Sequence, residues 1–425
     1  MENSISFCIN TAVDELPYLK LLMKSLKENL KYDHHEVIVF VDSDNQKTFE
    51  WLTTQKLEFK NLKILKNILP VCYGPIRNIN EMFKFASHEI VSYLQSDMVV
   101  SRNYDEYLLK HIKPNTILSS TRIEPPLHGP GPEKHTVNFG LTPSEFDYEG
   151  FLNYCDICRE DKTTSYYFAP FTLYREIWNT IGGQDNTFRR SRDDSDILNR
   201  FILSGVEIVQ TWEALVYHFT CTSSRGPGWH EPSNTKAQEK LQLQARADKV
   251  ELTRIFRKWG EFSHGHPTPY YYNIVSEINI DIDIGNLELF KNVEMFFIKN
   301  YITSKKLYNE FINENEHLYA NILYKYSQEQ WEEYKYMCNI ERLEDRVCIG
   351  EPEGDVVVSF NLSSINQNTF NNVLSKLQHI IHEAEPGDYE FEGFTFSIKN
   401  KENIIETKLK VNNPDIKPEH LYKVY

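Results

Sequence analysis

The chain has 425 residues, of which 25% are charged and 40% are aliphatic, aromatic or cysteine residues, a composition typical of a folded globular protein. Its 61 acidic and 46 basic side chains give a net charge of -15, which repels phosphate backbones and disfavours nucleic acid as a partner. A chain of this length exceeds one hydrophobic core of usual size, so we expect two domains.

The N-terminal residues and the cysteines point to a protein of the cytoplasm. The first 14 residues contain no basic region followed by an apolar run, and no stretch approaches the roughly 18 apolar residues that span a bilayer. The seven cysteines are scattered, and the close pair Cys155 and Cys158 falls within a predicted helix. Because no second pair completes a zinc site, we interpret this pair as reduced. We therefore predict a soluble cytoplasmic protein without a transmembrane segment.

Apolar runs and helical patterns alternate from the N-terminus, as in a parallel sheet covered by helices. The predicted elements are strands at 5–11, 36–41, 62–65 and 89–94 and helices at 16–30, 47–55 and 76–86. In such open sheets ligands bind beyond the carboxyl ends of the strands. Two acidic groups fall there, Asp42 with Asp44 after the second strand and Asp97 after the fourth. A cationic or polyhydroxylated ligand is expected at this edge.

The middle of the chain is interrupted by a segment rich in proline and glycine at 124–139, which predicts a long surface loop. A strand at 166–174, a helix at 194–203 ended by Gly205, and a strand at 214–218 follow. A helical pattern at 236–259 leads to a break at 260–269 that contains histidine, glycine and proline. We place the domain boundary at this break.

The domains predicted in this way are 1–262 and 270–425. The second shows aromatic-rich helices within 287–336 and strands at 355–361 and 389–398 around a helix at 370–383. No motif there carries chemistry, so we expect a smaller α+β accessory domain of unassigned role.

Asp97 and Asp194 suit a reaction at a nucleoside diphosphate. A divalent metal can neutralise the charge of a departing diphosphate, and an ion bound by phosphate oxygens needs only one or two protein ligands. Asp97 is correctly placed as such a ligand. A carboxylate at a helix N-terminus, as predicted for Asp194, stays ionised and can accept a proton from an attacking hydroxyl.

In chain order, separate segments resemble the family-2 glycosyltransferases, which have a GT-A fold with a Rossmann-like, mostly parallel sheet flanked by helices. The resemblance covers about the first 245 residues. Its first three segments are 5–11 with 39–44, then 74–78, then 95–98. By resemblance, the donor nucleotide contacts are Thr11, Asp42, Asp44, Arg77, Asn78, Gln95 and Ser96. Gln95 replaces the first acid of the family's DxD element, whereas Asp97 keeps the second, usually the metal ligand.

The most specific segment is Gly182-Gly183-Gln184-Asp185, followed by 192–196 and then by His218. The resemblance implies that Asp194 is the catalytic base of a single displacement with inversion, and that His218 completes a Mn²⁺ or Mg²⁺ site with Asp97. Further residues are expected to form a lid over the diphosphate, namely Arg225, Trp229 and His230. Residues expected to face the acceptor are Asp193, Arg190 and Arg192.

The predicted protein is therefore a hexosyltransferase-type glycosyltransferase with a nucleotide-sugar donor, UDP-sugar being favoured, and a glycan or other hydroxyl acceptor. The alternative is a non-catalytic carbohydrate- or nucleotide-binding protein on the same fold, which Gln95 motivates. A sugar-phosphate nucleotidyltransferase is discounted because residues 10–14 form no glycine-rich phosphate loop. A nicotinamide-dependent oxidoreductase is discounted because no GxGxxG follows a predicted strand.

Overall fold

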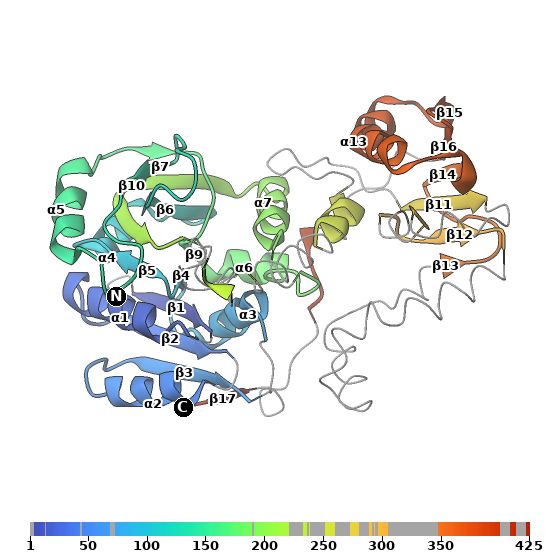
Figure 1. Cartoon of the computed structure of the whole chain (residues 1–425). Coiled ribbons are helices and arrows are strands. Elements are labelled where there is room, and N and C mark those ends of the chain that lie inside the picture. Colours follow the sequence, from blue (N-terminus) through green and yellow to red (C-terminus); the bar gives the residue numbers. More distant parts are fainter. Residues whose placement is uncertain are drawn as a thin grey trace. The chain divides into compact units, whose positions relative to one another are not determined.

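The computed structural model contains two compact units (Figure 1). It describes residues 4–12, 14–42, 45–68, 73–188, 191–220, 233–235, 238, 251–259, 273–279, 289–290, 293, 296–304, 347–399, 409–413 and 422–425. The first unit consists of 1–185, 189–248 and 411–425, and the second of 186–188 and 249–410. The end of the chain thus belongs to the first unit, whereas the sequence assigns it to a C-terminal domain.

The first unit is built on one large sheet whose central strands are parallel. Its order is β17-β3-β2-β1-β4-β9-β6-β10-β5, with β7 beside β6 and β8 beside β10. Pairs β1–β2, β1–β4, β2–β3 and β6–β10 are parallel, whereas β9, β5 and β17 pair antiparallel. The strands are β1 (Ile5–Thr11), β2 (Glu36–Val41), β3 (Leu62–Asn67), β4 (Ile90–Gln95), β5 (Met98–Val100), β6 (Thr116–Glu124), β7 (Lys134–Thr136), β8 (Thr163–Thr164), β9 (Phe171–Tyr174), β10 (Glu207–His218) and β17 (Tyr422–Val424).

Helices flank this sheet (Figure 1), so the predicted α/β fold class is confirmed. They are α1 (Leu16–Asn29), α2 (Gln46–Gln55), α3 (Pro75–Phe85), α4 (Tyr104–His111), α5 (Tyr148–Cys158), α6 (Arg175–Ile181) and α7 (Asp193–Leu203). Every residue of β2 is buried, which explains its continuous apolar sequence. Phe7, Leu19 and Val39 belong to the same buried cluster, in which α1 packs on the sheet. No helix of the described residues is long and apolar enough to cross a membrane.

Two predicted strands differ from the observed ones for local reasons. The strand expected at 166–174 is confined to β9, because Pro170 lacks the amide hydrogen that a sheet ladder needs. The strand expected at 389–398 is a hairpin, β15 (Gly387–Phe391) and β16 (Phe394–Ile398). Its turn contains Glu392 and Gly393, whose φ angles are 50° and 81°. The expected surface loop at 124–139 also contains the short strand β7.

The second unit has its own sheet, in the order β13-β12-β11-β14-β16-β15. Strands β11 (Ile274–Asn279), β12 (Asn300–Ile302), β13 (Val347–Cys348) and β14 (Val356–Asn361) are parallel, and β16 joins β14 antiparallel. Helix α13 (Gln367–Glu383) buries Phe370 and Leu377 in the core of this unit. Most of the helices expected within 287–336 lie outside the described residues.

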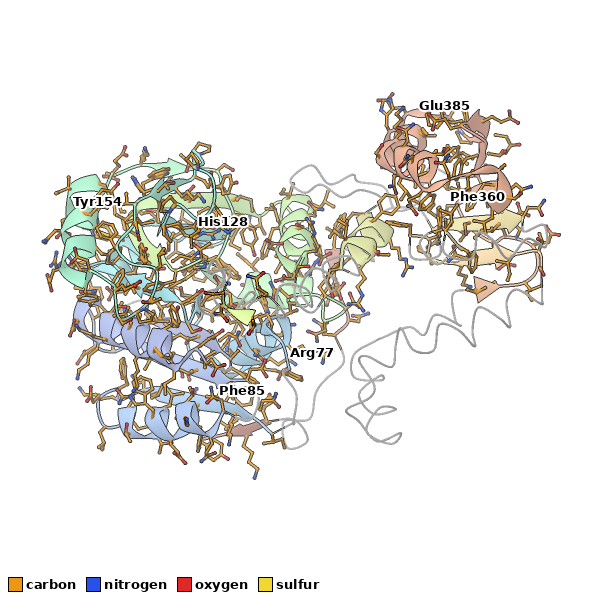
Figure 2. All side chains as sticks on the ribbon, viewed as in Figure 1. Arg77, Phe85, His128, Tyr154, Phe360 and Glu385 are labelled. Carbon is orange, nitrogen blue, oxygen red and sulfur yellow. The ribbon has the colours of Figure 1, made fainter. Side chains whose placement is uncertain are left out.

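The chain's end closes one edge of the first sheet. Strand β17 pairs antiparallel with β3, and the C-terminus lies beside it (Figure 1). The Tyr422 side chain is buried, packs its ring against Phe40 and Phe85, and donates a hydrogen bond to Glu81 Oε2 at 2.5 Å. Figure 2 shows Phe85 and Arg77 on the same helix, α3. The last strand is therefore anchored to the helix predicted to approach the nucleotide.

Candidate active site

The carboxyl ends of β1, β4, β6 and β10 meet at one edge of the sheet. Strands β1 and β4 are parallel neighbours, as are β6 and β10, and β9 runs antiparallel to both β4 and β6. All four strands therefore point the same way. They end with Thr11, Gln95, Glu124 and His218. This is the edge at which open α/β sheets bind ligands.

Asp97 and His218 lie next to each other at this edge. The Asp97 side chain is 2% exposed, and its Oδ2 lies 3.7 Å from Nε2 of His218. Strand β5, which follows Asp97, pairs with the end of β10, and the Asp97 carbonyl accepts a hydrogen bond from Phe219 N at 3.0 Å. Two atoms this far apart can both lie about 2.1 Å from one divalent ion. One carboxylate and one imidazole suit Mn²⁺ or Mg²⁺, with phosphate and water as further ligands.

Glu124 completes this group and is absent from the residues predicted from the sequence. Its Oε1 lies 2.7 Å from Nδ1 of His218, and it also pairs with Arg122 and Lys134. Burial raises the pKa of Glu124, but the hydrogen bond and charge of His218, together with the two cations, hold that pKa well below its ordinary value. Its place at the end of β6 brings it to the same edge of the sheet as Asp97, but nothing in the sequence indicates that its partner is His218.

Gln95 is the last residue of β4, and Ser96 lies between it and the metal-ligand candidate Asp97. Ser96 is buried and donates to Glu15 Oε2 at 2.5 Å, and the same oxygen accepts from Ala12 N at 2.8 Å. Glu15 therefore ties the end of β4 to the turn after β1. Burial and the charges of Asp97 and Glu15 raise the pKa of the nearby Tyr18 to about 12. Gln95, by contrast, is half-buried at the end of its strand.

Asp42 holds the start of α3. Its buried carboxylate accepts hydrogen bonds from Asn67 Nδ2, Tyr73 N, Gly74 N and Asn78 Nδ2, at 2.8, 2.6, 2.8 and 3.1 Å. A carboxylate at a helix N-terminus also stabilises the helix dipole. The buried Arg77 guanidinium lies 5.3 Å from the Tyr73 ring centroid. The structure thus brings together Asp42, Asn78 and Arg77 beside the ends of β1 and β2, and their nucleotide contacts stay predictions.

The acidic start of α7 divides into one exposed carboxylate and two engaged ones. Asp194 is exposed, and its Oδ1 accepts a hydrogen bond from Ser195 N at 2.7 Å. Asp193 accepts from Gln184 Nε2 at 3.0 Å, whereas Asp196 forms a fully buried ion pair with Arg200 at 2.9 Å. Arg192, just before the helix, adopts φ 63°. Among these acids, Asp194 is the one presented to solvent at the helix N-terminus.

The pKa of Tyr93 depends on two acidic groups, the start of α7 and Asp97. This buried tyrosine lies near the end of β4. Burial raises the pKa of its phenol, and the negative charges of Asp193 and then Asp97 raise it further. Tyr167 behaves similarly, with burial first and then the charge of Asp194. The charges at the start of α7 and at Asp97 thus both raise the pKa of the same buried phenol.

The two glycines before α7 are required by their surroundings. Gly182 and Gly183 adopt φ angles of 77° and 76°, which favour glycine. A Cβ on Gly183 would lie 2.3 Å from Asn80 Oδ1, and one on Gly182 would lie 2.1 Å from Val411 O. Asn413 Nδ2 also donates to the carbonyls of Gly182 and Gln184. The predicted lid and some other site residues lie outside the described part of the chain, namely Asp44, Arg190, Arg225, Trp229 and His230.

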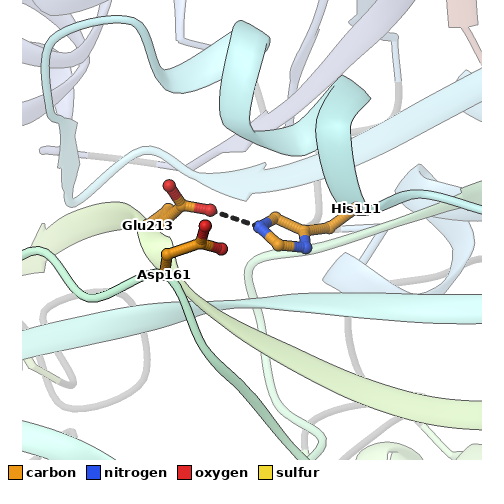
Figure 3. A group of neighbouring side chains, drawn as sticks. All are labelled: His111, Asp161 and Glu213. Atoms are coloured by element: carbon orange, nitrogen blue, oxygen red, sulfur yellow. Dashed lines mark hydrogen bonds and ion pairs between the residues drawn. The ribbon is translucent and has the colours of Figure 1, made fainter.

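A second group of possible metal ligands lies elsewhere on the sheet, formed by His111, Asp161 and Glu213 (Figure 3). His111 Nε2 lies 2.5 Å from Glu213 Oε2. Lys110 Nζ lies 2.7 Å from the same oxygen and 2.9 Å from Asp161 Oδ1, so an ammonium group already supplies the positive charge. Hydrogen bonds to these two carboxylates raise the pKa of Lys110. We interpret this group as an ion-pair cluster that ties α4 to β10.

Comparison with known proteins identifies the class. Residues 8–176 match the family model of glycosyl transferase family 2, so this part of the chain is a family-2 glycosyltransferase domain. The matched range includes Asp42, Asp97 and Glu124 and ends before Asp194 and His218. No curated protein sequence matches the chain.

Solved structures with a similar fold include GalNAc-T7 with UDP, GalNAc and Mn²⁺, at 14% identity and a TM-score of 0.42 over 61% of this chain and 49% of that one. TarS of S. aureus is similar at 15% identity and a TM-score of 0.37, over 60% of this chain and 43% of TarS. The mannosyltransferase PcManGT from Pyrobaculum calidifontis, in complex with GDP-Man and Mn²⁺, is similar at 12% identity and a TM-score of 0.39, over 63% of this chain and 67% of that one. The chain therefore spans about half the length of the first of these proteins.

Proposed function

We propose that the protein transfers a sugar from a nucleotide-diphospho-sugar, with a UDP-sugar favoured, to an acceptor hydroxyl in a metal-dependent, inverting reaction. The observation that carries this proposal is the buried Asp97 Oδ2 at 3.7 Å from His218 Nε2, at the carboxyl edge of a family-2 domain. These two residues would hold Mn²⁺ or Mg²⁺. When bound, the ion would neutralise charge on the diphosphate leaving group.

Asp194 is proposed as the base. It is exposed and lies in the first turn of α7, where an acceptor can reach its carboxylate from solvent. A carboxylate so placed can accept the proton of an acceptor hydroxyl while that oxygen attacks the anomeric carbon. A single displacement of this kind inverts the anomeric configuration. Asp193 and Arg192 border the same helix start and are proposed to face the acceptor.

Donor turnover tests the proposal. UDP-, GDP- and dTDP-sugars are incubated with Mn²⁺ or Mg²⁺, and release of the nucleoside diphosphate is followed for wild type, Asp194→Asn and the control Asp33→Asn, whose carboxylate is 88% exposed. Loss of one catalytic base is expected to lower turnover about 100-fold or more. Equal turnover in wild type and Asp194→Asn would remove Asp194 from this role.

Measurements of nucleotide binding, together with turnover, distinguish an enzyme from a non-catalytic binding protein. Calorimetry of UDP with and without Mn²⁺ is expected to show tighter binding with the ion, and Asp97→Ala should abolish that difference. UDP binding of equal strength without metal would rule out the proposed ion site. Tight binding of nucleotide-sugars with no turnover of any donor would favour the binding protein instead.

A further inference from the structure

Glu124 determines which nitrogen of His218 faces Asp97. Its Oε1 lies 2.7 Å from Nδ1 of His218, and the two side chains are 4% and 9% exposed. An ionised carboxylate can only accept hydrogen bonds, so the proton of this contact belongs to Nδ1 of the imidazole. Metal binding requires the neutral imidazole, and in that form Nε2 then carries the lone pair. This is the nitrogen 3.7 Å from Asp97 Oδ2.

Two cations hold Glu124 in place. Lys134 Nζ lies 2.7 Å from Oε2, and Arg122 Nη1 lies 3.1 Å from Oε1. Lys134 is only 11% exposed, and the Arg122 guanidinium is 4.1 Å from the Phe168 ring centroid. Both cations are therefore themselves fixed by their surroundings.

The proline-rich segment explains how Lys134 reaches this carboxylate. Strand β7 follows the glycines and prolines of that segment and pairs parallel with the end of β6, with Lys134 opposite Arg122. The segment thus begins at Glu124 and brings Lys134 back beside it. This arrangement connects a loop without a predicted role to the candidate ion site.

We propose that Glu124 is a positioning residue that keeps the proton of His218 on Nδ1 and directs Nε2 toward the ion, and that Lys134 and Arg122 hold Glu124 for this purpose. The inference rests on the proposed function, because it assigns a role within the same site. A carboxylate partner on the second nitrogen of a metal-binding histidine fixes the ring orientation. Its removal typically lowers metal affinity about 10- to 100-fold.

The experiment uses the full chain and two readouts that are independent of turnover. The ¹⁵N NMR signals of His218 report which nitrogen carries the proton, and electron paramagnetic resonance titration gives the Mn²⁺ affinity in the presence of UDP. The variants are Glu124→Ala, Glu124→Gln and Lys134→Met. The control is Glu149→Gln, the same chemical change at a carboxylate that is 74% exposed.

In wild type the neutral form of His218 is expected to carry its proton on Nδ1. In Glu124→Ala the two tautomers should mix, and the Mn²⁺ dissociation constant should rise about 10- to 100-fold. Glu124→Gln should have a Mn²⁺ dissociation constant between those of wild type and Glu124→Ala, because its amide oxygen still accepts from Nδ1. Glu149→Gln should match wild type. Lys134→Met should weaken Mn²⁺ binding less than Glu124→Ala, because Arg122 remains.

A Glu124→Ala protein with the wild-type tautomer and Mn²⁺ affinity would overturn the inference, as would an equal loss in Glu149→Gln. If Glu124→Ala does not fold, Glu124→Gln and Lys134→Met decide by the same measurements, and wild-type values in both would overturn it. If wild type binds no Mn²⁺ with UDP, the proposed ion site fails. The tautomers of wild type and the variants then still decide the role of Glu124.

Discussion

Asn80 and Gln184 exchange two hydrogen bonds: Asn80 Nδ2 donates to Gln184 O at 2.8 Å, and Gln184 N donates to Asn80 Oδ1 at 2.9 Å. Asn80 lies on α3, and Gln184 precedes α7. The Gln184 side chain in turn donates to Asp193 at 3.0 Å. The helix predicted to approach the nucleotide is thus joined to the start of the helix that carries the candidate base.

Replacing Asn80 by alanine should destabilise this junction. Both Asn80 and Gln184 are buried, at 5% exposure each, so the variant removes the acceptor of the buried Gln184 amide, whereas the Gln184 carbonyl keeps its bond from Asn413. We expect a loss of about 1–3 kcal/mol in the free energy of unfolding. Urea denaturation measures it, with the exposed Asn153→Ala as the control. Equal stability of the two variants would contradict the proposed importance of the exchange.

Gly183 and Gly205 have similar backbone conformations but differ in the space available to an added side chain. Both have positive φ, 76° and 74°, but an added Cβ meets Asn80 Oδ1 at 2.3 Å at Gly183 and nothing within 4 Å at Gly205. Gly205→Ala should therefore cost only the backbone strain, about 1–2 kcal/mol. Gly183→Ala should cost clearly more and should also disturb Asn80. Chemical denaturation of both variants measures the two losses of stability. A larger loss for Gly205→Ala than for Gly183→Ala would refute the close approach of Gly183 to Asn80.

The fold and part of the candidate site could be predicted from the sequence, because the apolar runs that form the strands are continuous stretches of the chain. Strands β1 and β2 are buried on both faces, so their apolar runs are visible in the chain, and the topology brings strand ends such as Asp97 and His218 to one edge. Glu124 could not be assigned in this way. Its role depends on the pairing of β6 with β10, which sets residues 94 positions apart side by side.

Strand β17 shows the same limit at the end of the chain. It has only three residues, and its partner strand β3 lies near the other end of the chain. No periodicity can reveal so short a strand, and its assignment to the first unit depends on a contact between residues 341 positions apart. The predicted second domain therefore included residues that complete the first sheet.

Tyr422 should be the main anchor of this last strand. Tyr422→Phe keeps the ring contacts with Phe40 and Phe85 but leaves the buried Glu81 Oε2 without this donor, which should cost about 1–3 kcal/mol. Tyr422→Ala should cost about 3–5 kcal/mol, because it also empties the ring's place in the core. Thermal unfolding measures both, with the exposed Val424→Ala as the control. If Tyr422→Ala unfolds like Val424→Ala, the strand contributes little to stability.

Asp105 should make the stability of the first unit depend on pH in the acid range. Its buried carboxylate accepts hydrogen bonds from His35 Nε2, Lys31 N and Tyr32 N, at 2.9, 2.8 and 2.9 Å. Burial raises its pKa, but these bonds together hold the pKa below the ordinary value of 3.8. Because the folded pKa is lower than the unfolded one, the ionised group stabilises the fold above about pH 3.8, and this contribution is lost as the pH falls through the folded value.

The test compares the free energy of unfolding of wild type and Asp105→Asn between pH 7 and acid. Asparagine can still accept hydrogen bonds but carries no charge, so the variant should be less stable at pH 7. The difference should narrow as the pH falls below about 3.8, because the wild-type carboxylate then takes up a proton. Asp33→Asn, at an 88% exposed carboxylate, should show no such narrowing. Parallel curves for wild type and Asp105→Asn down to acid pH would show that this carboxylate has the same pKa in the folded and unfolded chains.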